Sequence, residues 1–159
     1  MTTTNESRLN LRQLSADSYG VMIKLAGTAE KAALDAGLEK PLLELVRIRA
    51  SQINGCAYCL DMHTKDARHA GETEQRIYAL NAWEETAFYT ERERAALRLA
   101  EAITLVHQDR VADEVYDHAV KVFGEDQLAQ LVWVITVINA FNRVAITQRL
   151  EVGGYQPAA

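Results

Sequence analysis

Apolar residues recur every three or four positions along most of this chain, and no other feature of the sequence restricts its fold as strongly. Side chains at this spacing share one face of an α-helix, whereas a half-buried strand would need strict alternation. In residues 16–36 the pattern runs through Met22, Ile23 and Ala26, and Gly37 follows where a left-handed residue would end a helix. We therefore expect a long helix over residues 16–36.

The same reasoning predicts further helices, separated by residues that favour turns or caps. They are expected over residues 41–54, 56–70, 73–83, 90–106, 115–123 and 128–150. Asn54-Gly55 is a turn signal, so the helix before it should lead directly into the helix after it. Thr90 and Glu93 have the spacing of a capping box, in which the two residues satisfy backbone N–H groups reciprocally.

The segment from Leu128 to Ile138 is rich in β-branched residues and would also suit a buried strand. An isolated strand would leave its backbone groups unsatisfied, and no second strand-like run exists to pair with it. The helical spacing also continues beyond this segment to Leu150. We therefore predict an all-α bundle of about six to seven helices, in which a helix–turn–helix unit carries the C-x-x-C motif.

Length and composition favour one domain. A chain of 159 residues with 48% hydrophobic and 25% charged residues can bury most of its apolar surface in one core, and a second independent core is not expected. The polar residues 1–12 should form a flexible N-terminal segment. Residues 13–159 should form a single all-helical domain.

Charge and hydropathy exclude two classes of partner. The formal net charge is -5 and no block of Lys and Arg is present, which disfavours binding to a phosphate backbone. The apolar stretch from Leu128 to Ile138 is interrupted by Gln130 and Thr136 and is too short to span a bilayer, and the N-terminus lacks the apolar core of a signal peptide. We expect a cytoplasmic protein that binds neither nucleic acid nor membranes.

Both cysteines of the chain, Cys56 and Cys59, lie in one C-x-x-C motif, and His63 follows. If a helix begins near Cys56, the three side chains fall at positions i, i+3 and i+7 on one face. In a reducing compartment such a pair more often cycles between thiol and disulfide, or binds metal, than forms a permanent bridge. Glu44 lies twelve residues before Cys56 in an apolar run, which favours an inward-facing carboxylate near the sulfurs.

A thiol becomes a strong nucleophile only when it ionises, and the motif offers two ways to ionise one. Cys56 would lie nearest to a helix N-terminus, where partial positive charge favours a thiolate. Cys59 would instead depend on His63 and on a carboxylate from the preceding helix. These considerations leave open which sulfur attacks.

Two other interpretations of the cysteines are open. They can be two small buried residues at a helix junction. They can also belong to the zinc site of a zinc-stabilised binding or regulatory domain, with Cys56, Cys59 and His63 as three ligands. The fourth ligand would then come from a group of acidic and histidine side chains: Glu44, His69, His107 or His118. Structural zinc usually takes its ligands from two separated segments, which disfavours this interpretation.

Several polar residues also have ordinary structural interpretations. Glu44 can be an ion-pair partner of Arg47 or Arg49, and Asp61 and Lys65 have the spacing of a solvated pair on one helix. His69 would be a favourable charge near a helix C-terminus, while His107 and His118 would lie at the surface or between helices. Three residues of the last predicted helix should form hydrogen bonds between helices or subunits: Asn139, Asn142 and Arg143.

Together, Glu44, the twelve-residue gap, the Cys56–Cys59 motif and His63 resemble the alkylhydroperoxidase D-like (AhpD-like) branch of the carboxymuconolactone decarboxylase family. The resemblance is strong over roughly residues 40–75. The all-helical order on either side is compatible with the fold of that family. The resemblance implies that Cys59 is the peroxidatic thiolate, that Cys56 is the resolving cysteine, and that Glu44 and His63 form a proton relay.

The resemblance also implies a reaction and its partners. Thiolate attack on a hydroperoxide would give a sulfenic acid on Cys59, which would condense with Cys56 to a disulfide. We expect no cofactor, because the dithiol itself carries the two electrons. A thiol reductant of the dihydrolipoamide or thioredoxin type would restore the thiols. The apolar residues on several faces of the last predicted helix further suggest a homo-oligomer, a trimer or a hexamer.

The chain departs from the founding peroxidase of this family at one position. That enzyme has a second histidine between the two cysteines, where this chain has Tyr58, which is a poor base near neutral pH. The family also includes lactone decarboxylases, whose non-redox chemistry does not call for a cysteine pair. The presence of both cysteines favours the peroxidase interpretation over this alternative.

Overall fold

The computed structural model describes residues 8–157, and within this range the chain forms helices and no strand. The elements in chain order are α1 (Leu11–Leu14), α2 (Ala16–Asp35), α3 (Lys40–Asn54), α4 (Ala57–His69), α5 (Glu74–Ala79), the 3-10 helix η1 (Leu80–Glu85), α6 (Glu91–Thr104), α7 (Val106–Asp109) and α8 (Asp113–Gln148). The predicted all-α bundle is confirmed, and the C-x-x-C motif lies on the helix–turn–helix unit made by α3 and α4.

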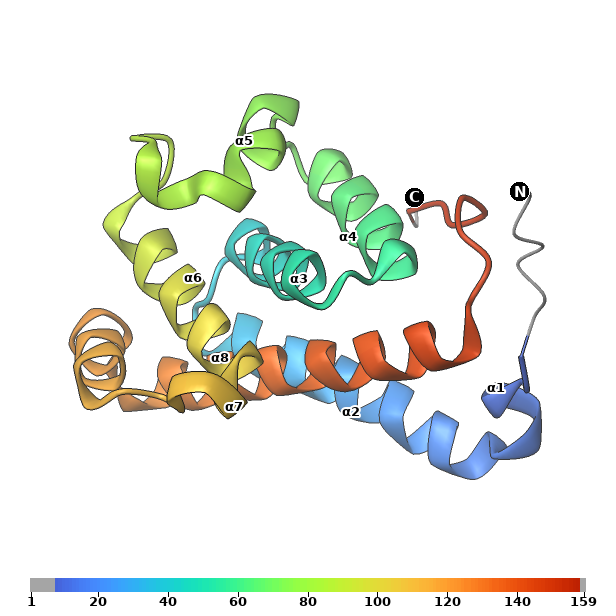
Figure 1. Cartoon of the computed structure of the whole chain (residues 1–159). Helices are drawn as coiled ribbons and strands as arrows, with labels where there is room; N and C mark the ends of the chain where they lie inside the picture. Colours follow the sequence, from blue (N-terminus) through green and yellow to red (C-terminus); the bar gives the residue numbers. More distant parts are fainter. Residues whose placement is uncertain (1–7, 158–159) are drawn as a thin grey trace.

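Helix α3 lies at the centre of the bundle, where it packs against α4, α6 and α8 (Figure 1). Every residue from Leu42 to Ile48 is buried, as expected for a helix with neighbours on several sides. Helix α2 runs along the other side of α8 and also contacts α1. The central helix therefore supports α4 and α8, two of the elements that form the site described below.

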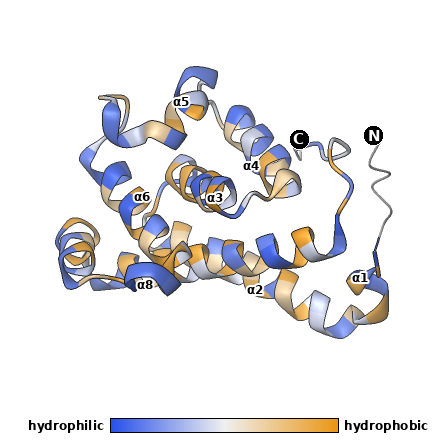
Figure 2. Ribbon diagram, in the orientation of Figure 1, coloured by the Kyte–Doolittle hydropathy of each residue, from blue (hydrophilic) through white to orange (hydrophobic). Residues whose placement is uncertain are grey.

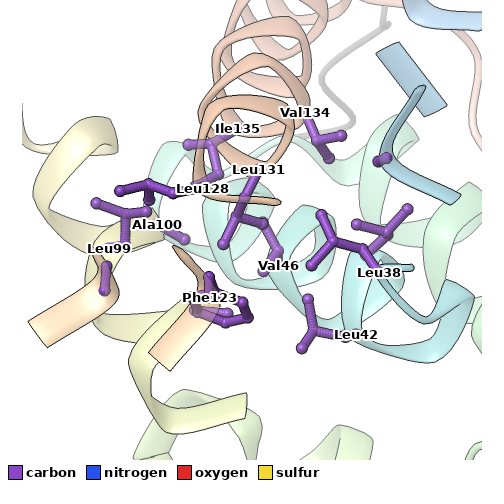
Figure 3. Packing of buried hydrophobic residues seen from close by; sticks show 14 of the residues in the cluster. Leu38, Leu42, Val46, Leu99, Ala100, Phe123, Leu128, Leu131, Val134 and Ile135 are labelled. Atoms are coloured by element: carbon purple, nitrogen blue, oxygen red, sulfur yellow. The ribbon is translucent and has the colours of Figure 1, made fainter. Parts of the chain in front are cut away.

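The main core forms where α3, α6 and α8 meet (Figure 3). Val46, Leu99, Leu131 and Ile135 are almost completely buried there. The first comes from α3, the second from α6, and the last two from α8. The β-branched segment that begins at Leu128 is thus helical, as predicted, and its side chains fill the core instead of pairing in a sheet.

Gly124 interrupts the helical geometry of α8, with φ 71° and ψ 169°. The predicted break between residues 115–123 and 128–150 is confirmed at this glycine, because few other residues adopt such a conformation without strain. By length and composition α8 could cross a membrane, but core helices of soluble proteins meet the same criterion. Leu131 and Ile135 of α8 have no exposed surface.

The prediction of seven helices differs from the structure in four places. The one-turn helices α1 and α7 were not expected, and α6 ends at Thr104 instead of continuing to Val106. The helix predicted over residues 73–83 is divided into α5 and η1, because Ala82 leaves the helical region with φ -120° and ψ 35°. The adjacent Trp83 is buried and its Nε1–H donates to Glu101 at 2.7 Å, so a tertiary contact overrides the local helical pattern.

The N-terminal segment expected to be flexible is described only from residue 8 onward. Arg8 Nη1 donates to the carbonyl of Thr147 at 3.3 Å, and the backbone N–H of Leu11 donates to Gln148 Oε1 at 2.7 Å. Residues 8–11 therefore lie against the end of α8. Residues 1–7 of that predicted segment lie outside the described residues, and the division into a segment and a domain stays a prediction.

The turn after α3 brings the two halves of the motif together. Gly55 ends α3 in the left-handed conformation, with φ 68°, and the N–H of Cys56 donates to the carbonyl of Ser51 at 3.0 Å. The chain then reverses into α4, which packs along α3. As a result, His63 comes to lie beside Glu44 although the two residues are 19 positions apart.

Replacing Gly55 by alanine should destabilise the protein, because a Cβ is strained in the left-handed region. We expect a loss of about 1 kcal/mol in the free energy of unfolding, measured by urea denaturation. Gly20 provides the matched control, because it lies in the exposed interior of α2 with open space around its Cα. Gly20→Ala should stabilise by about 0.5–1 kcal/mol. Equal effects of the two substitutions would contradict this account of the turn.

Candidate functional site

The centre of the site is a contact between Glu44 on α3 and His63 on α4. The distance from His63 Nδ1 to Glu44 Oε2 is 2.8 Å. Glu44 is 1% exposed and His63 is 8% exposed. The carboxylate expected to face inward does so, and it is in direct contact with the histidine of the motif.

Arg47 occupies the second oxygen of the same carboxylate. Its Nη1 donates to Glu44 Oε1 at 2.6 Å, and its Nη2 donates to Glu30 Oε2 on α2 at 2.9 Å. The interpretation of Glu44 as an ion-pair partner of Arg47 is thus also correct. One carboxylate therefore serves both contacts, and one guanidinium joins α2 to the site.

These contacts keep Glu44 ionised. Burial alone would raise the pKa of Glu44, but the hydrogen bond with His63 and the positive charge of Arg47 outweigh burial and hold this pKa below its ordinary value. An ionised carboxylate can only accept hydrogen bonds, so the proton of the shared hydrogen bond belongs to His63 Nδ1. In the neutral imidazole, Nε2 is then the nitrogen that can accept a proton.

Cys56 and Cys59 are joined by a disulfide bond, with their Cα atoms 5.4 Å apart. Cys56 is the N-cap of α4, and its Sγ accepts the backbone N–H of Cys59 at 3.4 Å. Each cysteine is 1% exposed, and both pack beside Ala50 and Ile138. Cys59 lies one helical turn before His63 on the same face of α4. The structure is therefore that of the oxidised form.

A cavity of about 610 Å³ lies beside the Glu44–His63 pair. Glu44, Arg47, His63 and Asp66 contribute polar groups to its wall. The largely apolar remainder includes residues from α2 and α8: Ile23, Ala26, Val134, Val137, Ile138 and Phe141. Neither cysteine lines the cavity. His63 therefore belongs both to the cavity wall and to the face of α4 that carries Cys59.

The side chains considered from the sequence as zinc ligands, Cys56, Cys59 and His63, do not form a metal site in this disulfide-bonded form. Among the described residues, the side chains whose metal-binding atoms gather within 4.8 Å of one another are Glu44, His63 and Asp66, without a sulfur. Arg47 lies against Glu44 and adds positive charge beside this group. That charge disfavours a cation at the same carboxylate.

Amide side chains form a hydrogen-bonded network between α3, α6 and α8. Asn54 Nδ2 donates to Asn139 Oδ1 at 2.9 Å and to Asn142 Oδ1 at 2.8 Å. Asn142 Nδ2 donates to Ser51 Oγ at 3.0 Å, and Asn139 Nδ2 donates to Thr104 Oγ1 at 3.0 Å. The predicted hydrogen bonding between helices is confirmed for both asparagines, and it fixes the end of α3 that leads to the cysteines.

The remaining polar residues singled out from the sequence lie apart from the cysteines or act locally. Arg143 donates to the carbonyl of Asn139 on its own helix at 2.7 Å. His69 lines the cavity at the end of α4, and His118 contacts Glu91 at 3.0 Å. The remaining histidine, His107, is exposed on α7, and the predicted pair of Asp61 and Lys65 is confirmed at 2.9 Å.

Sequence reasoning missed part of a polar stripe on α3. Glu44, Arg47, Ser51 and Asn54 follow one another at three- and four-residue spacing along a helix whose first half is mostly apolar. Such spacing places the four side chains on one face, and a buried helix needs partners for them. The spacing could have identified Ser51 and Asn54 as network residues. No local signal identified Asp66 or the C-terminal residues that reach it.

Comparisons with known proteins find a matching family profile and a similar protein. The profile of the carboxymuconolactone decarboxylase family matches residues 20–102. The uncharacterised protein YdfG of Bacillus subtilis (strain 168) is 43% identical over 139 residues, which are 87% of this chain and 92% of that protein.

Two solved structures are similar to this one. A protein of unknown function from Agrobacterium tumefaciens, described as a candidate antioxidant defence protein AhpD, has a TM-score of 0.85 and 32% identity over 94% of this chain and 100% of the other. The debrominase Bmp8 C82A, bound to 2,3,4-tribromopyrrole, has a TM-score of 0.69 and 20% identity over 81% of this chain and 69% of the other. The second similarity concerns the fold alone.

Glu44 should make stability depend on pH in the acid range. Its folded-state pKa lies below the ordinary value of 4.5 expected in the unfolded chain. The stabilisation by the ionised form is therefore fully present above pH 4.5 and is lost as the pH falls through the folded-state pKa. Glu44→Gln should lower the free energy of unfolding by about 2 kcal/mol at pH 7. The difference in the free energy of unfolding between Glu44→Gln and the wild type should shrink as the pH falls, measured by urea denaturation at each pH. A constant difference would contradict this assignment, and the exposed Glu84→Gln is the control.

Removal of the central amide should also destabilise the protein. Asn142 has no exposed surface, and Asn142→Ala would leave buried groups of Ser51 and Asn54 without their partner. We expect a loss of about 2 kcal/mol in the free energy of unfolding. Thr136→Ala on the exposed face of the same helix should change stability by less than about 0.5 kcal/mol.

Proposed function

Because the chain belongs to the carboxymuconolactone decarboxylase family and its AhpD-like branch, we propose that it is a thiol-dependent hydroperoxide reductase. The observation that carries this proposal is the disulfide-forming pair at the start of α4, in which Cys59 lies one helical turn from a buried histidine whose ring is held by an ionised carboxylate. This combination supplies a redox-active dithiol and a proton acceptor within one helix–turn–helix unit. The similarity to a candidate antioxidant protein, at 32% identity, supports the same proposal.

In the proposed reaction, the reduced Cys59 thiol gives its proton to His63 Nε2, directly or through a water molecule. The thiolate attacks one oxygen of the hydroperoxide, the O–O bond breaks, and the alcohol leaves with the proton returned by His63. Cys59 is then a sulfenic acid. Glu44 stabilises the protonated imidazole and keeps its Nδ1–H in place, so the relay uses both residues.

Cys56 resolves the sulfenic acid in this scheme. Its thiolate attacks the sulfur of Cys59, hydroxide leaves and is protonated to water, and the disulfide seen in this structure forms. The N-cap position of Cys56 and the N–H of Cys59 directed at its sulfur both favour a Cys56 thiolate without a neighbouring base. An external dithiol then supplies two electrons and two protons to restore both thiols.

The proposal extends to partners. The reductant would be a small or protein dithiol of the dihydrolipoamide or thioredoxin type. The chain would also form a homo-oligomer, because apolar residues extend along α2 and α8 (Figure 2) and several of them are exposed. On α2 these are Val21, Ile23, Leu25 and Leu34, and on α8 they include Tyr116, Trp133 and Ile146. Apolar surface of this kind is normally covered by another copy or a partner.

Substitution of the cysteines tests the reaction. The wild type should consume cumene hydroperoxide in the presence of dithiothreitol or dihydrolipoamide, and Cys59→Ser should reduce consumption to the background rate. Cys56→Ser should retain the first step, so that a sulfenic acid accumulates and can be trapped with dimedone. Equal rates in all three proteins would contradict the proposal. A burst that survives in Cys59→Ser but not in Cys56→Ser would reverse the roles of the two sulfurs.

Substitution of the histidine tests the relay. His63→Ala should lower kcat/KM about a hundred-fold or more, because a positioned base contributes this much to proton transfer. His118→Ala is the matched control, since that residue contacts Glu91 on the exposed surface. An unchanged rate in His63→Ala would exclude His63 as the base.

A further inference from the structure

The C-terminal tail after α8 turns back over α4 (Figure 1). The N–H of Gly153 donates to Asp61 Oδ2 at 3.3 Å. Lys65 Nζ donates to the carbonyls of Gly153 at 3.4 Å and Tyr155 at 2.9 Å. The pair of Asp61 and Lys65, which on its own would be an ordinary surface pair, thus fixes the tail to the helix that carries the cysteines.

Tyr155 connects this tail to the site. Its hydroxyl donates to Asp66 Oδ1 at 2.7 Å, and Asp66 belongs with Glu44 and His63 to the polar groups of the cavity. Tyr155 and Pro157 also line the cavity themselves. Burial, followed by the hydrogen bond and negative charge of Asp66, raises the pKa of Tyr155 to about 12. The phenol is therefore a hydrogen-bond donor throughout the neutral range.

The charges around the cavity restrict what can bind in it. Its wall includes the lysine and arginine side chains of Lys40 and Arg47, and both contact Glu30, at 3.8 and 2.9 Å. Arg47 is also paired with Glu44. Among the described side chains of the wall, Lys40 and Arg47 thus each have a carboxylate partner already, while Asp66 is a carboxylate that accepts from a neutral phenol. A ligand carboxylate would find no lysine or arginine in this wall that lacks a carboxylate partner, whereas an uncharged apolar body would fit the wall from α2 and α8.

We propose that the cavity selects uncharged apolar molecules over those carrying a carboxylate, and that Tyr155, held by the tail, is a specificity-determining residue of its wall. This inference rests on the proposed function for the identity of the substrate class, which would be uncharged organic hydroperoxides. The preference of the cavity for uncharged molecules can be measured by ligand binding, without turnover.

The experiment uses two probes with the same apolar body, titrated calorimetrically into the oxidised full-length protein. Cumyl alcohol, the product expected from cumene hydroperoxide, is the neutral probe, and 4-(2-hydroxypropan-2-yl)benzoate is its carboxylate analogue. We expect the neutral probe to bind at least about ten-fold more tightly. Asp66→Asn should narrow this difference, because it removes the negative charge that the analogue would face. Equal affinities for the two probes in the wild type would overturn the charge selection.

Variants of the tail test the role of Tyr155. Tyr155→Ala should weaken binding of cumyl alcohol about ten-fold, because part of the apolar wall is lost. Tyr155→Phe keeps the ring and should stay within about three-fold of the wild type. Lys65→Met should weaken binding in the same direction as Tyr155→Ala, although Lys65 does not line the cavity. The exposed Tyr116→Phe is the control, and urea denaturation establishes that each variant is folded. Unchanged binding in a folded Tyr155→Ala would overturn the assignment.

Hydroperoxide turnover, measured on the same proteins, separates this inference from the proposed function. Binding that depends on Tyr155 without any turnover would contradict the reductase and leave the binding site standing. Hydroperoxide turnover in a protein that binds the two probes equally, and whose turnover is unchanged by Tyr155→Ala, would contradict the binding inference and leave the reductase standing.

Discussion

The buried carboxylate of Glu44 is the group on which the arrangement of the site depends. An ionised carboxylate with 1% exposure is unfavourable unless charged and hydrogen-bonding partners surround it. His63 and Arg47 supply these partners, and Arg47 in turn contacts Glu30. Three helices are thereby held in a fixed relation around one negative charge. Displacement of α4 would remove His63 from Glu44, and displacement of α2 would remove Glu30 from Arg47.

Helix α3 combines this polar function with its position in the core. Val46 and Leu43 face the apolar cluster shared with α6 and α8, while the polar stripe from Glu44 to Asn54 faces other partners. No buried side-chain nitrogen or oxygen lacks a hydrogen-bond partner among the described residues. The stripe therefore does not disrupt the core, and it orients the turn at Gly55 that leads into the cysteines.

Local patterns accounted for most of the secondary structure and for the motif itself. Thr90 and Glu93 form the expected capping box, and Gly55 ends α3 as expected, because both signals act within a few residues. The bend at Ala82 was not predictable in this way, since it depends on the burial of Trp83 against another helix.

The contacts of the site also differ in whether local sequence could predict them. The pairing of Glu44 with His63 could be expected from the motif, because the turn at Gly55 reverses the chain. The hydrogen bond of Tyr155 with Asp66 spans 89 positions and joins a tail without periodicity to a helix. Such a contact depends on where α8 ends relative to α4, which is a property of the packed bundle and not of either segment.

The separation of the cavity from the sulfurs has a pharmacological consequence. A compound that fills the apolar wall would touch the imidazole and the tail but not Cys56 or Cys59, because neither cysteine lines the cavity. Such a compound would need no electrophilic warhead. It could occupy the disulfide form seen in this structure, in which a thiol-directed compound would find no free thiol to react with.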